Sequence, residues 1–169
     1  APKFIPTHLI LPELSTFAIN KTDRFIVDID EISGGHPYKG QGTQDPDNGA
    51  HVNWDNSGNR WPAGTLVTDF PAIYAVADGY VDRIDRYDRV GVDKYKYGIH
   101  YVFAQKDGRP VTFHMSIEPY LDPNDSTFYE PFIMVEVGDP VRKGDILAYM
   151  YLAPNGREAG PHIHFSVQP

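Results

Sequence analysis

The chain has 169 residues and a formal net charge of −8 at pH 7. This length suits one domain with a single hydrophobic core, and the acidic balance excludes nucleic-acid binders that need a basic face to neutralise phosphates. Because the chain has no cysteine, disulfides, thiolate metal ligands and cysteine nucleophiles are excluded, so any metal ion must be bound through nitrogen and oxygen.

Glycine and proline are frequent, with 15 residues of each, and no long stretch has the helical period of 3.6 residues. This composition favours an all-β fold of mostly antiparallel strands joined by turns. No apolar run approaches the roughly 18 residues that cross a bilayer, so we expect no membrane span. The first residue, Ala1, fits a processed export product and equally a trimmed chain.

The first fifty residues are expected to form an arm and loops. Apolar residues interrupted by proline, from Ala1 to about Asn20, favour an extended arm that packs on the body of the protein. Residues 25–29 are predicted to form a short strand. Residues 34–64 are rich in Gly, Asn, Asp, Pro and Ser, which predicts a long structured loop, and loops of this length are often functional. This loop contains His51 and Asp55.

Beyond the loop, alternating apolar residues and turn signals become regular. Residues 72–87 are predicted to form a hairpin around Asp78-Gly79, and residues 98–115 a second hairpin around Asp107-Gly108. His114 lies on the second hairpin. A closing strand is predicted from His162 to Val167.

Several charged and histidine residues have an ordinary surface interpretation. Three Asp-Arg pairs recur every third residue between positions 82 and 89, and we expect a solvated strand end with ion pairs of little energetic weight. His8, His36 and His100 are expected to be surface histidines; the alternative for His36 is an approach to the metal in a latent form of the protein.

Two histidines near the chain end give the most specific chemical signal. A strand over Gly160-Pro161-His162-Ile163-His164-Phe165 would carry His162 and His164 on one face, with Cα atoms about 7 Å apart. His51 and Asp55 are spaced so that both could aim at one point. Zinc in hydrolases takes three protein ligands and leaves a fourth position for water, so His51, Asp55 and one histidine of the pair meet that count.

Five segments follow one another in the order found in a known family. His51-Val52-Asn53-Trp54-Asp55 resembles the motif His-x-Gly-x-Asp, with Asn53 in the place of glycine. The chain therefore resembles the lysostaphin-type, LytM-like zinc metallo-endopeptidases, bacterial enzymes that cut cell-wall peptides. The resemblance covers about His51 to Val167. Its other segments are IYAVADGYVDRI (73–84), VTFHMS (111–116), VEVGDPVRKGDILAYM (135–150) and GPHIHF (160–165).

The resemblance implies a fold and a set of site residues. The fold is an all-β, duplicated-hybrid-motif peptidase fold, similar to a barrel-sandwich, with long loops around a groove. It would form a single domain over residues 1–169, with an N-terminal arm and loops at 1–50 and the peptidase core at 51–167. The site residues implied are His51, Asp55 and His164 as ligands of one Zn²⁺ ion, and His114 and His162 as catalytic residues. Which of these two acts as general base stays open.

The resemblance also implies a function. The protein would be a zinc-dependent endopeptidase that cleaves peptidoglycan stem or cross-bridge peptides by metal-activated water, secreted or periplasmic in the bacterial cell envelope, and monomeric. One alternative is a non-catalytic wall-binding or hydrolase-activating module on the same scaffold, a class that usually loses the metal ligands. Another is a sugar-transport phosphocarrier, which uses paired histidines for phosphoryl transfer and has no need for His51 or Asp55.

Overall fold

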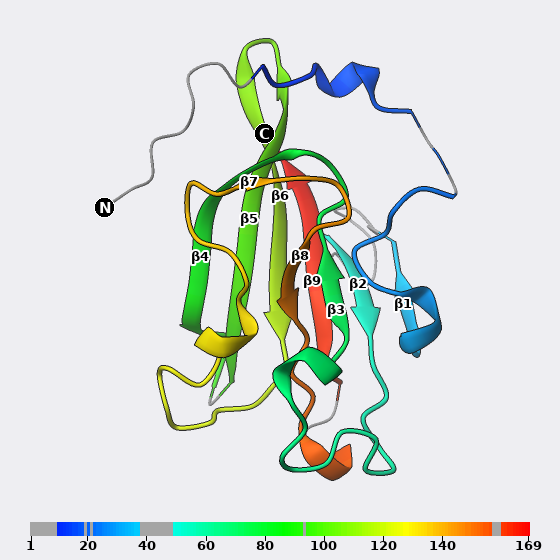
Figure 1. Ribbon diagram of the computed structural model, residues 1–169, viewed down its shortest axis with the longest axis vertical. Helices are drawn as coiled ribbons and strands as arrows, with labels where there is room; N and C mark the ends of the chain where they lie inside the picture. Colours follow the sequence, from blue (N-terminus) through cyan, green and yellow to red (C-terminus); the bar gives the residue numbers. More distant parts are fainter. Residues whose placement is uncertain (1–9, 19, 21, 38–48, 93, 157–159) are drawn as a thin grey trace.

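The computed structural model describes residues 10–18, 20, 22–37, 49–92, 94–156 and 160–169 (Figure 1). The described chain is all-β, as the composition predicts, and contains nine strands and five short 3-10 helices. The strands are β1 (Gly34–His36), β2 (Ala50–Asn53), β3 (Ala72–Tyr74), β4 (Gly79–Arg89), β5 (Tyr95–Lys106), β6 (Arg109–Glu118), β7 (Pro140–Val141), β8 (Ile146–Tyr149) and β9 (His162–Gln168). The helices are η1 (Leu14–Thr16), η2 (Ile29–Glu31), η3 (Val67–Asp69), η4 (Glu130–Phe132) and η5 (Pro154–Gly156).

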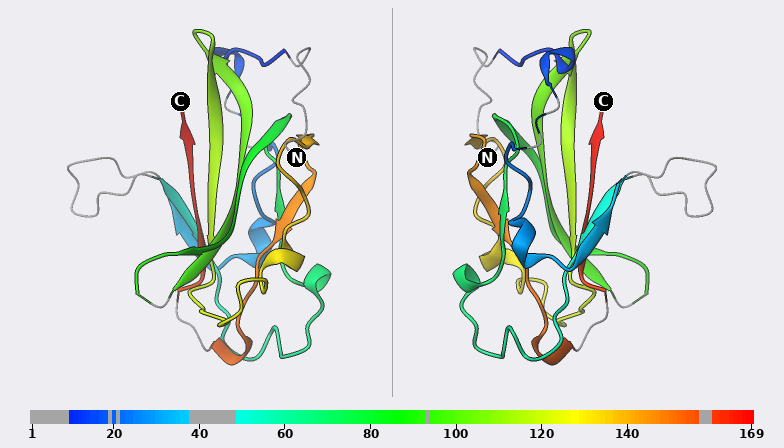
Figure 2. Two further views of the ribbon diagram at one scale, coloured as in Figure 1. Left: turned by 90° about the vertical axis from the view of Figure 1, so that its left-hand side faces the viewer. Right: turned by 90° about the vertical axis from the view of Figure 1, so that its right-hand side faces the viewer.

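The strands form two antiparallel sheets. The larger sheet has seven strands in the order β1-β2-β9-β6-β5-β4-β7, and the smaller sheet pairs β3 with β8. Figure 2 shows the two sheets edge-on as separate layers. No helix in the described ranges is long and apolar enough to cross a membrane.

The predicted hairpin over residues 98–115 is confirmed. It joins β5 to β6 through Asp107 and Gly108, whose φ angles are 51° and 76°. Two successive residues with positive φ make a type I′ turn, whose twist matches that of the flanking strands. The hairpin therefore forms the centre of the large sheet, where each strand has a neighbour on both sides.

The two faces of the large sheet differ in chemistry. Residues directly opposite each other in a sheet share a face, and so do alternate residues along one strand. One face is apolar and packs into the core; in β5, for example, it carries the fully buried side chains of Tyr97, Ile99 and Tyr101. The other, which we call the histidine face, carries six of the seven histidines: His36, His51, His100, His114, His162 and His164.

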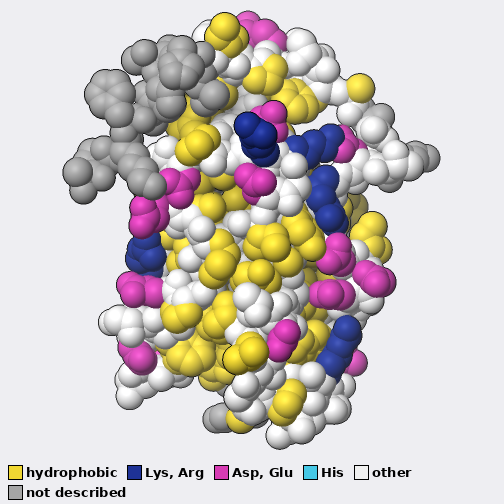
Figure 3. Space-filling view, in the orientation of Figure 1, with side chains coloured by type: hydrophobic (Ala, Val, Ile, Leu, Met, Phe, Trp, Pro, Cys, Tyr) yellow, Lys and Arg dark blue, Asp and Glu magenta, His cyan; other side chains and the backbone are white. Residues whose placement is uncertain are grey.

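The small sheet covers the apolar face of the large sheet. In Figure 3, apolar side chains gather over the middle of the molecular face that β3 and β8 occupy, and no described histidine is visible there. Two hydroxyl groups on β5 cross the core to this layer. Tyr97 donates to the Tyr149 carbonyl oxygen at 2.5 Å and accepts the Tyr151 N–H at 2.8 Å, while Tyr101 accepts the Val76 N–H at 3.1 Å.

The predicted hairpin over residues 72–87 is wrong. Its first arm, β3, pairs with β8 in the small sheet, whereas its second arm, β4, pairs with β5 and β7 in the large sheet. The chain changes layer between the two arms. The Ala75 N–H donates to the Asp145 carbonyl oxygen, in the segment before β8, at 2.9 Å. The next N–H along the chain, that of Val76, donates to the Tyr101 hydroxyl. The turn residues Asp78-Gly79 therefore mark a crossing between layers.

Two further expectations for the first half of the chain need correction. Residues 25–29 form no strand, because the chain bends at Ile26 and Val27 and the helix η2 begins at Ile29. Residues 34–64 contain the paired strands β1 and β2, so His51 lies on a strand and not in a loop. Residues 38–48 of that predicted loop lie outside the described residues.

The N-terminal arm is confirmed where the structure describes it, from residue 10 onward. Pro12 accepts the Gln105 backbone N–H at 2.9 Å, and Leu11 accepts its side-chain amide at 2.9 Å. Phe17 packs edge-on against Phe103 with ring centroids 5.4 Å apart. The arm thus lies against the far end of β5, and residues 1–9 and 19 of the prediction lie outside the described chain.

We expect Tyr97→Phe to destabilise the fold strongly. The substitution removes two hydrogen bonds, to the Tyr149 carbonyl oxygen and from the Tyr151 N–H, at a cost of about 0.5–1.5 kcal/mol for each bond. Urea unfolding followed by circular dichroism measures this loss. Tyr87→Phe is the control, because its hydroxyl bonds Asp122 near the surface, and an equal loss in both variants would contradict the bridging role of Tyr97.

Candidate metal and catalytic site on the histidine face

Three histidines stand side by side on neighbouring strands at one edge of the histidine face. His36 on β1 is directly opposite His51 on β2, which is directly opposite His164 on β9. His36 Nε2 lies 3.0 Å from His51 Nδ1, and His51 Nε2 lies 2.7 Å from His164 Nδ1. The structure therefore brings together the predicted ligands His51 and His164, and adds His36 at the other ring nitrogen of His51.

The donor atoms of His51 and His164 suit a divalent cation. Two nitrogens that share one tetrahedral zinc ion at 2.0–2.1 Å are about 3.3 Å apart, so the observed pair needs only a small opening to hold an ion. Metal-binding histidines almost always use the second ring nitrogen for an orienting hydrogen bond. For His51 this second nitrogen is Nδ1, and its partner is His36 Nε2.

Two groups beside the pair shape the site. Gly49 lies so close to His164 that a β-carbon would be 2.5 Å from its Nε2 atom and 2.6 Å from the Phe165 carbonyl oxygen. Asn53 is directly opposite His162, and its Oδ1 atom is buried with no hydrogen-bond partner in the described chain. A buried oxygen of this kind calls for a water molecule or an ion as partner.

Asp55, the third predicted ligand, makes a different contact. Its side chain is exposed, and its Oδ1 atom accepts the Ser57 N–H at 2.9 Å. The hydrogen bonds from Ser57 lower the pKa of Asp55, so the carboxylate is ionised at neutral pH. Binding a cation together with His51 and His164 would require release of the Ser57 bond.

Within the described ranges, no group of three or more His, Asp or Glu side chains is arranged to enclose a metal ion. The donor types fit zinc, and two of the three predicted donors already meet. The complete ligand set of His51, Asp55 and His164 stays a prediction.

His162 is held on both sides of its ring. Its Nε2 atom is 3.0 Å from the Glu118 carboxylate, and its Nδ1 atom is 2.9 Å from the Gly160 carbonyl oxygen. The ring centroid lies 4.7 Å from that of His51, and the Tyr120 ring packs edge-on against it at 4.8 Å. This predicted catalytic residue therefore lies beside the histidine pair in a fixed orientation.

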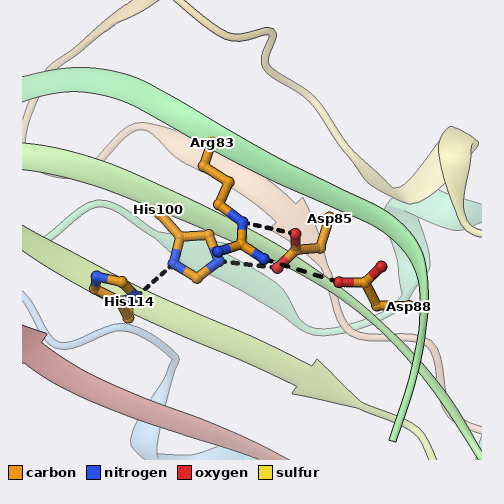
Figure 4. A network of polar contacts seen from close by, with 5 residues as sticks. All are labelled: Arg83, Asp85, Asp88, His100 and His114. Carbon is orange, nitrogen blue, oxygen red and sulfur yellow. Dashed lines mark hydrogen bonds and ion pairs between the residues drawn. The ribbon is translucent and has the colours of Figure 1, made fainter.

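His114 lies on the other side of His164. It is directly opposite Ser166 on β9, which makes His164 its diagonal neighbour with β-carbons about 7–8 Å apart. Its Nδ1 atom is 2.8 Å from His100 Nδ1, and His100 Nε2 is 3.0 Å from Asp85 Oδ2. Figure 4 shows this line of side chains crossing from β4 to β6.

The electrostatics of this line follow from burial and hydrogen bonding. Burial would raise the pKa of Asp85, but hydrogen bonds from His100 and Arg83 outweigh it and lower that pKa. Burial also lowers the pKa of His114, and the positive charge of Arg83 adds to the shift. Near neutral pH, Asp85 is therefore an anion, and His114 is neutral.

Sequence analysis missed several residues of the site. His100 is a buried strand residue and His36 is half-buried against His51, so the surface interpretation of both is wrong. Asp85 is also buried, in contrast to the solvated strand end predicted for it. The alternation of His100 with Ile99 and Tyr101 in a strand was a signal for a shared polar face. No sequence signal pointed to Glu118.

Comparisons with protein-family models, with curated proteins and with solved structures found no match. The motif resemblance therefore stays a hypothesis about the family.

We expect Gly49→Ala to push the His164 ring away from His51. The added β-carbon would meet the ring on one side and the fixed Phe165 carbonyl on the other. Ring ¹⁵N chemical shifts of both histidines should change. Gly34→Ala is the control, because nothing lies within 4 Å of its added β-carbon, and unchanged ring shifts in Gly49→Ala would contradict the close packing.

We expect Asp85 to stabilise the fold in a pH-dependent way. Because its folded-state pKa is lowered from 3.8, the contribution is complete above that value and is lost as the pH falls through the lower folded pKa. Asp85→Asn should cost about 1.5–3 kcal/mol at pH 7, and the difference from the wild type should shrink below about pH 4. Urea unfolding at a series of pH values measures it. Asp88→Asn is the control, because that half-exposed carboxylate is 4.0 Å from the same guanidinium; a pH-independent difference for Asp85→Asn would refute the linkage.

Proposed function

We propose that this protein is a zinc-dependent endopeptidase that cleaves peptide bonds with water as the nucleophile. The observation that supports this best is the convergence of His51 Nε2 and His164 Nδ1 at 2.7 Å. His162 lies beside this pair on one side, and His114 lies diagonally across from His164 on the other. A cation site flanked by two proton-transfer groups is the arrangement that metal-assisted hydrolysis needs.

The residues that would hold the ion are His51, His164 and Asp55, the last after its release from Ser57. A bound zinc ion would lower the pKa of a coordinated water molecule to about 7 and polarise the peptide carbonyl group. His36 orients the His51 ring through the bond at 3.0 Å. Asn53 Oδ1 offers one more acceptor on the same face.

The remaining chemistry falls to His114 and His162. One side chain takes a proton from water as its oxygen attacks the carbonyl carbon, and one gives a proton to the departing amine. Both are placed for proton transfer: His162 is fixed by Glu118 and Gly160, and His114 by His100. His114 and His164 are half-buried on the sheet surface, where an extended peptide could reach them.

The proposed substrates are peptidoglycan stem or cross-bridge peptides. The order of the five motifs supports this choice, since enzymes with these motifs act on the bacterial cell wall. A location in the bacterial cell envelope, secreted or periplasmic, follows from that substrate. The monomeric state that the motif resemblance implies is part of the same proposal.

A non-catalytic wall-binding module is the second candidate. One observation favours it: the Asp55 carboxylate is bonded to Ser57 and not to a histidine in the described chain. Such a module would bind peptidoglycan without releasing peptides from it. The release of soluble peptides from peptidoglycan therefore separates the two functions.

We expect the purified protein to hold about one zinc ion per chain and to release soluble peptides from peptidoglycan. A chelator should abolish the release, and added zinc should restore it. His51→Ala should lose the metal, because one of its nitrogen donors is gone. His114→Ala should keep the metal and lose about 10²–10⁴-fold in turnover, the usual scale for loss of an acid-base group.

Thr112→Val is the matched control for His114→Ala, because Thr112 lies two residues away on the same face of β6. It should retain zinc content and turnover. Cleavage that survives the chelator would rule out the metal mechanism. Binding to peptidoglycan without cleavage would favour the non-catalytic module.

A further inference from the structure

Three side chains form a continuous hydrogen-bonded line across neighbouring strands of the large sheet (Figure 4). The line starts at Asp85 on β4, passes through His100 on β5 and ends at His114 on β6. Its two links measure 3.0 Å and 2.8 Å. Asp85 and His100 are 8% and 6% exposed, and hydrogen bonds shielded from water in this way hold their partners firmly.

The direction of these hydrogen bonds follows from the carboxylate end. Asp85 accepts Arg83 Nε–H on Oδ1 at 2.9 Å, and its Oδ2 atom faces His100 Nε2. An ionised carboxylate only accepts, so His100 must donate from Nε2. In its neutral form His100 has a single N–H, on Nε2, and its Nδ1 atom is left as an acceptor.

The tautomer of His114 follows in turn. Its Nδ1 atom lies 2.8 Å from the acceptor Nδ1 of His100, so it must donate that hydrogen bond. Neutral His114 then carries its proton on Nδ1 and a lone pair on Nε2. Figure 4 shows the second ring nitrogen of His114 on the side turned away from His100.

We propose that Asp85 and His100 are positioning residues that fix His114 with a lone pair on Nε2, and that His114 is the proton acceptor of the reaction. This inference rests on the proposed endopeptidase function. His162 differs, because both of its ring nitrogens already face oxygen acceptors, on Gly160 and Glu118. The structure thus favours one of the two predicted catalytic histidines as the base.

The proton balance of the step is simple. An O–H bond of the attacking water breaks, its proton goes to His114 Nε2, and the water oxygen bonds to the carbonyl carbon. His114 becomes an imidazolium that still donates from Nδ1 to His100, and the Asp85 charge stabilises it through that ring. During the attack the carbonyl π pair moves onto the carbonyl oxygen. When that pair re-forms the C=O bond, the C–N bond breaks and the departing amine takes the proton from His114, which restores neutral His114.

The surroundings of the line keep Asp85 ionised and His114 neutral. Burial lowers the pKa of His114, and the positive charges of Arg83 and Lys96 act in the same direction, while Asp85 opposes them. Asp82 also lies within electrostatic range of His100. Near neutral pH, His114 is therefore held as a neutral acceptor.

The decisive variant is Asp85→Asn, since it should reverse every hydrogen bond in the line. Arg83 needs an acceptor, so the new amide oxygen would face Arg83 and the amide N–H would face His100. His100 would then accept at Nε2 and donate from Nδ1. His114 would have to accept at Nδ1 and carry its proton on Nε2, which removes the lone pair from that atom.

Ring ¹⁵N chemical shifts of the zinc-loaded protein report these tautomers directly. His114 should carry its proton on Nδ1 in the wild type, and on Nε2 in Asp85→Asn. His100→Gln is the conservative rescue, because its amide can donate to Asp85 and accept from His114. His100→Leu removes the acceptor, so His114 should no longer prefer the tautomer with its proton on Nδ1. Asp88→Asn, which alters a carboxylate near the same arginine, should leave the His114 tautomer unchanged.

Kinetics on a peptidoglycan peptide give the second measurement. In Asp85→Asn, kcat should fall by about 10²–10⁴-fold, with KM and zinc content unchanged. His100→Gln should retain kcat within about tenfold of the wild type, and His100→Leu should not. A His114 tautomer that stays on Nδ1 in Asp85→Asn would overturn the inference, as would a kcat that does not follow the tautomer. A wild-type protein with the expected tautomers and no peptidase activity would refute the proposed function and leave the tautomer assignment standing.

Discussion

The hydroxyl of Tyr97 joins the two layers of this protein. The Tyr97 side chain is fully buried, and its hydroxyl donates to the Tyr149 carbonyl oxygen at the end of β8 and accepts the Tyr151 N–H just beyond it. Tyr101 does the same for Val76. Because these anchors hold β5 from its core side, the residues that alternate with them on the other side, Gly98 and His100, are held equally firmly. The chemistry of the histidine face depends on this rigidity.

Sequence reasoning succeeded where local rules decide the structure. Strict alternation and an Asp-Gly turn specify the β5-β6 hairpin, and alternation likewise places His162 and His164 on one face. It failed where distant contacts decide. The β3 segment joins the small sheet because its backbone finds partners there, and not in the strand that follows it along the chain. Asp85 stood among repeated Asp-Arg pairs, and the two register shifts that flank it in β4 could not be derived from the sequence.

The candidate site consists of two groups of histidines with different partners. One group, His51 and His164, presents nitrogen donors to each other and has a further histidine, His36, behind it. The other, His100 and His114, connects to a buried carboxylate. A cation suits the first group and a proton suits the second, so in the proposed hydrolase the first group would bind the metal ion and the second would transfer the proton. The sequence motifs pointed to residues of both groups, but they did not indicate that the residues form two separate groups.

Strand β1 has only three residues, yet it pairs with β2 along the edge of the large sheet. Without it, β2 would present unpaired backbone groups to the solvent, and such an edge is a template for association with other chains. Residues 34–36 thus cover the edge of β2. A fragment that starts at His51, where the motif resemblance begins, would lose that protection.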